Sequence, residues 1–168
     1  LENNLFGNFI KKKGLEFEEH IVKMLKNKHY FFEVDKNLSN SSKYNLTLEK
    51  MNEGIPIIYQ GLVIDFDNKL FGYPDLIVRN DYLNKITNFK NEFPKREEGN
   101  GSYYVVVDIK YSNLVFRRKR DTLVNTGMFG CFKSQLIIYN SCLTKMQKYD
   151  PGVAFILGRK WNKNSKTG

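Results

Sequence analysis

Two charged residues, two positions apart, follow an apolar run. Asp108 and Lys110 end the sequence Tyr103-Tyr-Val-Val-Val-Asp-Ile-Lys, which is rich in β-forming residues. Side chains alternate along a strand, so the two charged groups point to one face while Val107 and Ile109 point to the other. Strands often end in charged residues where they leave the core. The pair also fits a metal site, in which Asp108 binds a divalent cation and Lys110 positions and helps to deprotonate a water molecule.

Two more carboxylates stand in apolar surroundings. Asp75 follows Pro74 at the start of an apolar run, and proline in a strand is typical of an edge or a bulge, where a sheet re-aims a side chain. Glu18 falls within the apolar face of a predicted helix, where a carboxylate is costly unless it is paired, protonated or bound to a cation. The simpler interpretations are a turn aspartate after proline and a first-turn glutamate near the helix dipole.

A predicted helix near residues 132–148 carries two further polar groups. Gln135 and Tyr139 lie one turn apart within its apolar face. The simpler interpretations are that Gln135 is a core amide bonded to the backbone and that Tyr139 is an ordinary residue of the core.

A basic run follows the Asp108 strand. It consists of Arg117, Arg118, Lys119 and Arg120, and it suits either phosphate binding or a solvated basic loop. We also include Lys133, in the following helix, among the candidate nucleic-acid-binding residues.

The elements that must position these residues follow from the hydrophobic pattern. It predicts a helix from Gly14 to about Leu25, a second helix ending at Gly54, and a β-hairpin whose turn is residues 65–68. A polar loop at residues 80–101 leads to the Asp108 strand, then the helix at 132–148 and a short strand at 153–157. The order predicts an α/β domain with a central mixed β-sheet flanked by helices. We expect a lead-in at residues 1–13, one domain at 14–161 and a tail at 162–168.

Composition limits the class of protein. The chain has 168 residues and a net charge of +9, which favours a polyanionic partner such as nucleic acid, although an AT-rich coding sequence also yields abundant Lys and Asn. No stretch approaches the roughly 20 apolar residues of a membrane span, and no signal peptide is visible. We therefore expect a soluble, intracellular protein with no membrane partner. Only Cys131 and Cys142 are present, which excludes a four-cysteine iron-sulfur cluster.

Taken together, the motifs resemble those of a known superfamily. Glu18 in Gly-x-x-Phe-Glu, Gly72-Tyr-Pro-Asp75, Asp108-Ile-Lys110 and Gln135-x-x-x-Tyr139 occur in the order of the PD-(D/E)XK nucleases. The last motif is similar to the RecB-like branch, as is the segment from Thr47 to Gly61. The resemblance spans about residues 14–157 and implies a restriction-endonuclease-like fold. Some members are fused to helicases, so a helicase or polymerase domain in a longer parent chain is a possible partner.

The resemblance implies metal-dependent hydrolysis of phosphodiester bonds in DNA, with RNA not excluded. It assigns Asp75, Asp108 and the carbonyl of Ile109 to Mg²⁺ or Mn²⁺, with Glu18 as a direct or water-mediated ligand. Lys110 positions the attacking water.

Gln135 and Tyr139 are expected to contact the substrate backbone or to brace Lys110. The cysteine cluster of the iron-sulfur members is missing, so no such cofactor is implied. Two alternatives stay open: a catalytically inactive nuclease-like module that binds nucleic acid, and a basic protein-interaction module.

Overall fold

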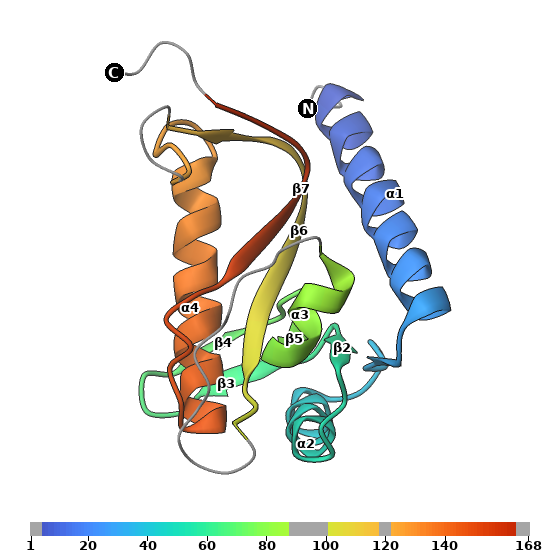
Figure 1. Ribbon diagram of the computed structural model, residues 1–168, viewed down its shortest axis with the longest axis vertical. Coiled ribbons are helices and arrows are strands. Elements are labelled where there is room, and N and C mark those ends of the chain that lie inside the picture. The colour runs from blue at the N-terminus through green and yellow to red at the C-terminus, as the bar shows by residue number, and fades with distance from the viewer. Residues whose placement is uncertain (1–4, 88–100, 118–121, 164–168) are drawn as a thin grey trace.

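A five-stranded mixed sheet forms the centre of the molecule (Figure 1). The computed structural model describes residues 5–87, 101–117 and 122–163. The strand order is β1-β2-β5-β6-β7, in which β1 and β2 are parallel, β5 is antiparallel to both β2 and β6, and β6 and β7 are parallel. The strands are β1 (Phe31–Glu33), β2 (Ile57–Tyr59), β5 (Leu76–Arg79), β6 (Tyr104–Phe116) and β7 (Phe155–Lys163). The antiparallel strands β3 (Val63–Asp65) and β4 (Leu70–Gly72) form a separate hairpin.

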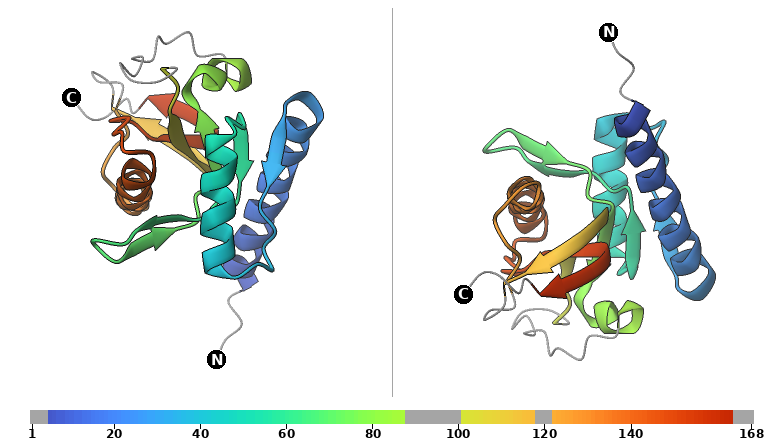
Figure 2. Two further views of the ribbon diagram at one scale, coloured as in Figure 1. Left: turned by 90° about the horizontal axis from the view of Figure 1, so that it is seen from below. Right: turned by 90° about the horizontal axis from the view of Figure 1, so that it is seen from above.

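Helices cover both faces of this sheet, so the predicted α/β class with a mixed sheet flanked by helices is confirmed. On one face, α1 (Leu5–Lys28) and α3 (Asn80–Ile86) pack through Ile21, Leu25 and Leu83. On the other face lie α2 (Asn40–Asn52) and α4 (Phe129–Gln147). Figure 2 shows the β3–β4 hairpin extending from the sheet beside α4.

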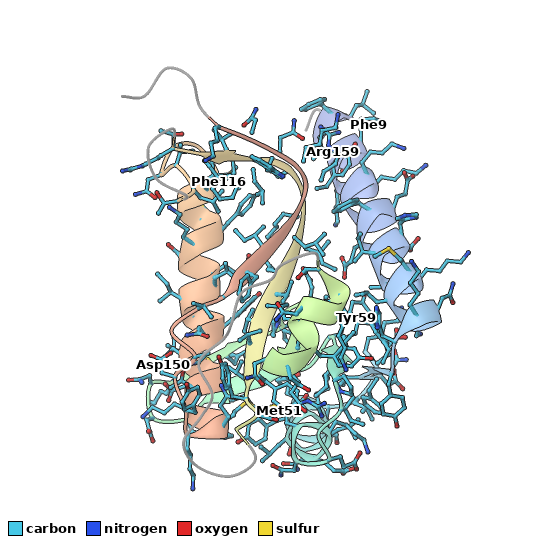
Figure 3. All side chains as sticks on the ribbon, in the orientation of Figure 1. Phe9, Met51, Tyr59, Phe116, Asp150 and Arg159 are labelled. Carbon is cyan, nitrogen blue, oxygen red and sulfur yellow. The ribbon has the colours of Figure 1, made fainter. Side chains whose placement is uncertain are left out.

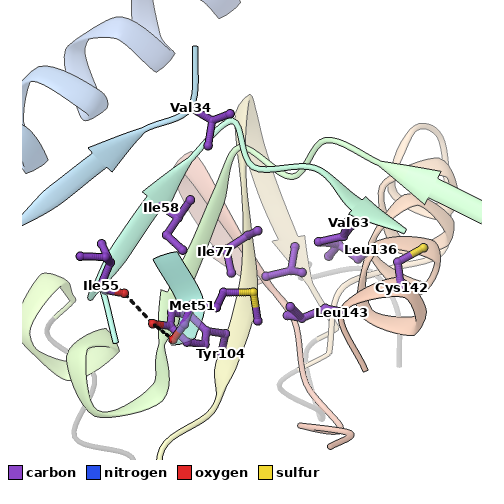
Figure 4. Close-up of a cluster of buried hydrophobic side chains, with 11 residues drawn as sticks. Val34, Met51, Ile55, Ile58, Val63, Ile77, Tyr104, Leu136, Cys142 and Leu143 are labelled. Carbon is purple, nitrogen blue, oxygen red and sulfur yellow. Dashed lines mark hydrogen bonds between the residues drawn. The ribbon is translucent and has the colours of Figure 1, made fainter. Parts of the chain in front are cut away.

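The core on the α2 and α4 side of the sheet is built from every second residue of the central strands. Ile58, Ile77 and Val106 are fully buried there and belong to one cluster with Leu143 of α4. Figure 4 shows this cluster, with Ile58, Ile77 and Leu143 labelled. Because side chains alternate, Leu76 and Val107 point to the opposite core, beneath α1. This alternation decides which face of the sheet receives Asp75 and Asp108.

The first helix is longer than the sequence pattern predicts. Residues 5–13, expected as a lead-in, are the first turns of α1, and Gly14 lies inside the helix. Glycine costs a helix interior only about 1 kcal/mol, and the lysine-rich segment before it has good helix propensity. The expected tail likewise begins too early, because β7 continues to Lys163. Residues 164–168 lie outside the described part.

Two other expectations need correction. Residues 80–101 were expected to form a loop, but α3 occupies the first part of this segment, where Leu83 is buried against the sheet. Residues 88–100 lie outside the described part. The strand expected to end at Lys110 continues to Phe116, because pairing with β7 resumes at Asn113 after an irregular step. That continuation has partners far away in the chain, which local pattern does not reveal.

The segment between α2 and β3 is held by a buried threonine. Thr47 is fully buried, its hydroxyl donates to the carbonyl of Lys43, and its Oγ1 accepts a hydrogen bond from the Leu62 backbone at 3.0 Å. The predicted hairpin turn is confirmed, with Asp65 Oδ1 accepting from the backbone of Asp67 and Asn68. None of the helices in the described ranges is long and apolar enough to cross a membrane.

Candidate active site

Asp75 and Asp108 meet across the antiparallel pair of β5 and β6. The register pairs Leu76 with Val107, which places Asp75 opposite Asp108 one step beyond the ladder. Directly opposed residues have Cβ atoms about 4.5–5.5 Å apart. Asp75 Oδ2 accepts a hydrogen bond of 2.6 Å from the Ile109 backbone, which fixes this carboxylate against β6. Both side chains therefore reach the α4 face of the sheet.

This arrangement confines two like charges in a dry place. Asp108 is 1% exposed. Burial first, then the negative charge of Asp108 and, least, that of Glu18 raise the pKa of Asp75 to about 8, against the lowering effect of the Ile109 hydrogen bond. The pair therefore favours a bound proton or a cation at neutral pH.

Lys110 supplies a positive charge beside the acidic pair. Its Nζ lies 2.6 Å from Asp108 Oδ2 and above the ring of Phe132, 5.5 Å from the centroid. The contact between Lys110 and Asp108 is an ion pair without the geometry of a hydrogen bond. Within the described part of the chain, Asp108 Oδ2 accepts no hydrogen bond. A buried carboxylate oxygen without such a bond has a lone pair available for a ligand.

Helix α4 brings Gln135 and Tyr139 to the same place. Gln135 Nε2 donates to the Tyr139 hydroxyl at 2.7 Å. Burial raises the pKa of Tyr139, Gln135 opposes this, and the charges of Asp108, Lys110 and Asp75 all act on the hydroxyl. The tyrosine hydroxyl is therefore within electrostatic reach of the acidic pair and its lysine.

Gly72 makes room for that tyrosine. A Cβ atom on Gly72 would clash with Cε1 and Cδ1 of Tyr139, so only glycine allows the ring to lie against β4. The sequence pattern contained this glycine in Gly72-Tyr-Pro-Asp75 but gave no reason for it.

Glu18 approaches from the opposite side and is held by two partners. Its Oε1 accepts from the Tyr59 hydroxyl at 2.9 Å and from Gln60 Nε2 at 3.1 Å. Burial, followed by the bond to Glu18, raises the pKa of Tyr59 above its ordinary value. Gln60 has a left-handed φ of 57°, and its backbone N–H also donates to the Asp75 carbonyl at 3.1 Å. These two contacts link Glu18 to the acidic pair.

Tyr59 and Gln60 are site residues that sequence reasoning did not assign. They follow the apolar run 55–58 and lie within the segment from Thr47 to Gly61 that resembles RecB-like nucleases, but no role was assigned to either of them. A polar amide at the end of a buried strand is uninformative until the fold shows which side chain it meets.

The basic residues lie away from this cluster or outside the described ranges. Arg117 is exposed after β6, and Lys133 donates its ammonium hydrogens to the Leu123 carbonyl and to Asn125 Oδ1. Lys133 thus anchors the loop before α4. Arg118, Lys119 and Arg120 fall in the gap between the described segments.

The donor set suits a hard divalent cation. Carboxylate and carbonyl oxygens are the ligands that Mg²⁺ and Mn²⁺ prefer, and Asp75, Asp108 and the Ile109 carbonyl offer them together. In the described ranges, however, no three His, Cys, Asp or Glu side chains gather closely enough to hold a metal ion. The structure therefore does not bring Glu18 into one ligand group with the two aspartates, and a direct bond from Glu18 lacks support.

Comparison with protein-family models, with curated proteins and with solved structures found no match to this chain.

Proposed function

We propose that this protein is a Mg²⁺- or Mn²⁺-dependent nuclease that hydrolyses phosphodiester bonds of DNA. The observation that carries the proposal is the pair of the half-buried Asp75 and the buried Asp108, opposed across β5 and β6, with Lys110 Nζ 2.6 Å from Asp108 Oδ2. The order of the motifs, which resembles that of RecB-like PD-(D/E)XK nucleases, supports the same conclusion. On this proposal the fold is restriction-endonuclease-like.

The acidic pair provides a site for the metal. Asp75, Asp108 and the Ile109 carbonyl would hold it, with Glu18 acting through a water molecule. When bound, the cation neutralises the phosphate charge and lowers the pKa of a bound water. Burial and the charge of Asp108 raise the pKa of Asp75 to about 8, so two negative charges at this pair are unfavourable near neutral pH. The acidic pair thus lowers the stability of the folded protein, and a bound cation would remove the repulsion between the two carboxylates.

The remaining residues of the cluster suit the handling of water and phosphate. The Lys110 ammonium has three donors and forms an ion pair with Asp108 without a directed hydrogen bond, so its donors can orient the nucleophilic water and contact a phosphate oxygen. The Tyr139 hydroxyl accepts from Gln135 and therefore keeps its own proton to donate to a phosphate oxygen. The net charge of +9 favours a polyanionic substrate.

The test is cleavage of linear, circular and single-stranded DNA with Mg²⁺ or Mn²⁺ and, in parallel, with chelator. We expect metal-dependent cleavage that Asp108→Asn and Lys110→Ala each lower about 100-fold or more, while DNA binding is largely kept. Asp67→Asn and Lys145→Ala are matched controls, because they break an exposed ion pair of 2.9 Å that includes no residue of the cluster. Both controls should cleave normally.

The outcomes separate the candidate functions. Binding without cleavage by the parent protein would indicate an inactive nuclease-like module, and neither binding nor cleavage would indicate a protein-interaction module. Survival of circular DNA alone would favour an enzyme that starts from ends.

A further inference from the structure

Beyond the candidate site, β6 and β7 continue together as a two-stranded ribbon. We define the ribbon as residues 111–116 and 158–163. It begins where Lys110 pairs with Gly158, and after the irregular step its pairing runs from Asn113 with Lys160 to Phe116 with Lys163. The ribbon is therefore a direct continuation of the strand that carries Asp108. It leads to the end of the molecule where α1 and α4 begin (Figure 1).

The ribbon is positively charged. None of its residues is Asp or Glu, whereas Arg159, Lys160 and Lys163 lie on β7, and Arg117 follows β6 directly. From Lys110 to the C-terminus the sequence contains only two acidic residues, at positions 121 and 150. Such a segment attracts a polyanion.

The contacts that Arg159 makes on the ribbon do not neutralise its positive charge. It donates to Asn113 Oδ1 and to the Tyr111 hydroxyl, both at 3.0 Å, and its guanidinium lies 4.8 Å from the centre of the Tyr111 ring. These partners are neutral, so they orient the cation without cancelling it. In Figure 3, Arg159 and Phe116 lie toward the same end of the molecule as Phe9.

An aromatic platform lies among these cations. Trp161 is 68% exposed although it is a large apolar side chain, and its ring meets Phe116 edge-on, with centroids 6.3 Å apart and planes at 88°. The indole therefore contacts Phe116 and still exposes most of its surface. Exposed aromatic rings set in a basic groove are the feature with which proteins bind single-stranded nucleic acids.

We propose that the ribbon binds single-stranded DNA, with Trp161 stacking on an unpaired base and Arg159, two positions before it on β7, contacting the phosphate backbone. A base within a duplex has both faces covered by its neighbours, so an indole stacks on an unpaired base without the unstacking cost that insertion into a duplex requires. The substrate of the proposed nuclease is accordingly a single strand or a frayed end, an inference that rests on the proposed function.

The spacing along β6 gives the reach of this contact. Trp161 pairs with Leu114, four residues beyond Lys110. At about 3.3 Å per residue the distance is at most about 13 Å, which corresponds to about four stacked nucleotides at 3.4 Å each. A 12-nucleotide strand therefore spans both the acidic pair and the ribbon.

Tryptophan fluorescence tests the proposal directly, because Trp161 is the single tryptophan of the chain. The full chain is titrated in chelator with a 12-nucleotide oligothymidylate, so no cleavage is needed. We expect quenching of the tryptophan signal as the strand binds. By fluorescence anisotropy of a labelled strand, Trp161→Ala should weaken binding about 5- to 100-fold, and Trp161→Phe should keep most of it.

Two further variants separate stacking from charge. Phe66→Ala is the matched control, because Phe66 is 67% exposed but lies on the β3–β4 turn, and its affinity should not change. Arg159→Gln should reduce the slope of log affinity against log salt by about 0.7 while the quenching at saturation remains.

Several results would overturn the proposal. These are unchanged affinity of Trp161→Ala, equal quenching by blunt duplex DNA or by heparin, and a fluorescence change with protein concentration alone that marks self-association. Failure of the proposed function looks different, because strand binding with quenching would persist without cleavage. If the protein cleaves DNA but Trp161→Ala changes neither binding nor quenching, the proposed nuclease function stands and the proposal that the ribbon binds the strand is wrong.

Discussion

At the scale of single residues, Asp75 is the group whose environment most disturbs its chemistry. Burial and the charge of Asp108 raise its pKa to about 8 in the folded protein, whereas an unfolded aspartate titrates near 3.9. The folded state therefore binds a proton that the unfolded state has released between these two pH values. Stability then falls as the pH rises through this window.

We expect the metal-free protein to lose stability from about pH 4 to about pH 8, and Asp75→Asn to remove most of that loss. The amide is neutral at every pH and can still accept from the Ile109 backbone. In chelator at pH 8 the variant should be more stable than the parent by about 1–3 kcal/mol. Urea unfolding at pH 5 and pH 8 measures this, and parallel curves for both proteins would contradict it.

Gly72 is a second residue with a specific prediction. Gly72→Ala should lower the free energy of unfolding by about 1–3 kcal/mol and reduce cleavage, because the new methyl group displaces the ring of Tyr139. Gly130→Ala is the matched control, since its Cβ meets no atom within 4 Å. Thermal unfolding and a cleavage assay check both, and equal behaviour of the two variants would refute the steric argument.

The residues of the acidic pair were identifiable from sequence because strand alternation and the proline at Pro74 act locally. Asp108 and Lys110 needed only the period of a strand to share a face. The contacts to Glu18 were not accessible in this way, since Tyr59 and Gln60 reach it across more than 40 positions of sequence. Which carboxylate receives those donors depends on how α1 lies over the sheet.

At the scale of elements, α1 offers a simple test of its unexpected length. Gly14 sits within the helix and its Cβ would meet open space, so Gly14→Ala should stabilise the protein by about 0.5–1 kcal/mol. Thermal unfolding monitored by circular dichroism measures this. An unchanged melting temperature would indicate that residues 5–13 form the non-helical lead-in that the sequence pattern suggested.

The junction between α2 and the hairpin depends on Thr47. Thr47→Val should cost about 1–3 kcal/mol, because it leaves the buried Leu62 N–H without an acceptor, whereas Thr47→Ser keeps the hydroxyl. Chemical denaturation of the three proteins measures the difference. A valine variant no less stable than the serine variant would mean that the hydroxyl contributes little.

Element types were more predictable than element lengths. The helices at α2 and α4 and the β3–β4 hairpin follow from periodicity and turn residues. The extension of β6 to Phe116 depends on its partner β7, more than 40 positions later, and β7 itself loses its apolar pattern after Leu157. Pairing between distant strands overrides local composition there.

At the scale of the whole molecule, a cation should act as a stabilising ligand. At a free Mg²⁺ or Mn²⁺ concentration of about 100 times Kd, binding adds about 2.7 kcal/mol, which corresponds to a rise of about 5–10 °C in Tm for a chain of this size. Asp108→Asn should abolish the shift, and Asp67→Asn, at an exposed turn, should keep it. Differential scanning calorimetry measures the shift in Tm with Mg²⁺ or Mn²⁺, and Ca²⁺ serves as a third cation for comparison. A shift of equal size in Asp108→Asn would place the cation elsewhere.

The irregular step in β6 between Lys110 and Asn113 has an evolutionary consequence. In the part of β6 that precedes this step, residues 104–110, a single inserted residue would turn Asp108 and Lys110 to the opposite side of the sheet. After it, pairing restarts in its own register, so insertions can accumulate without disturbing the acidic pair. Descendants of a common ancestor should accordingly differ in length beyond residue 113 and keep constant spacing between residues 104 and 110.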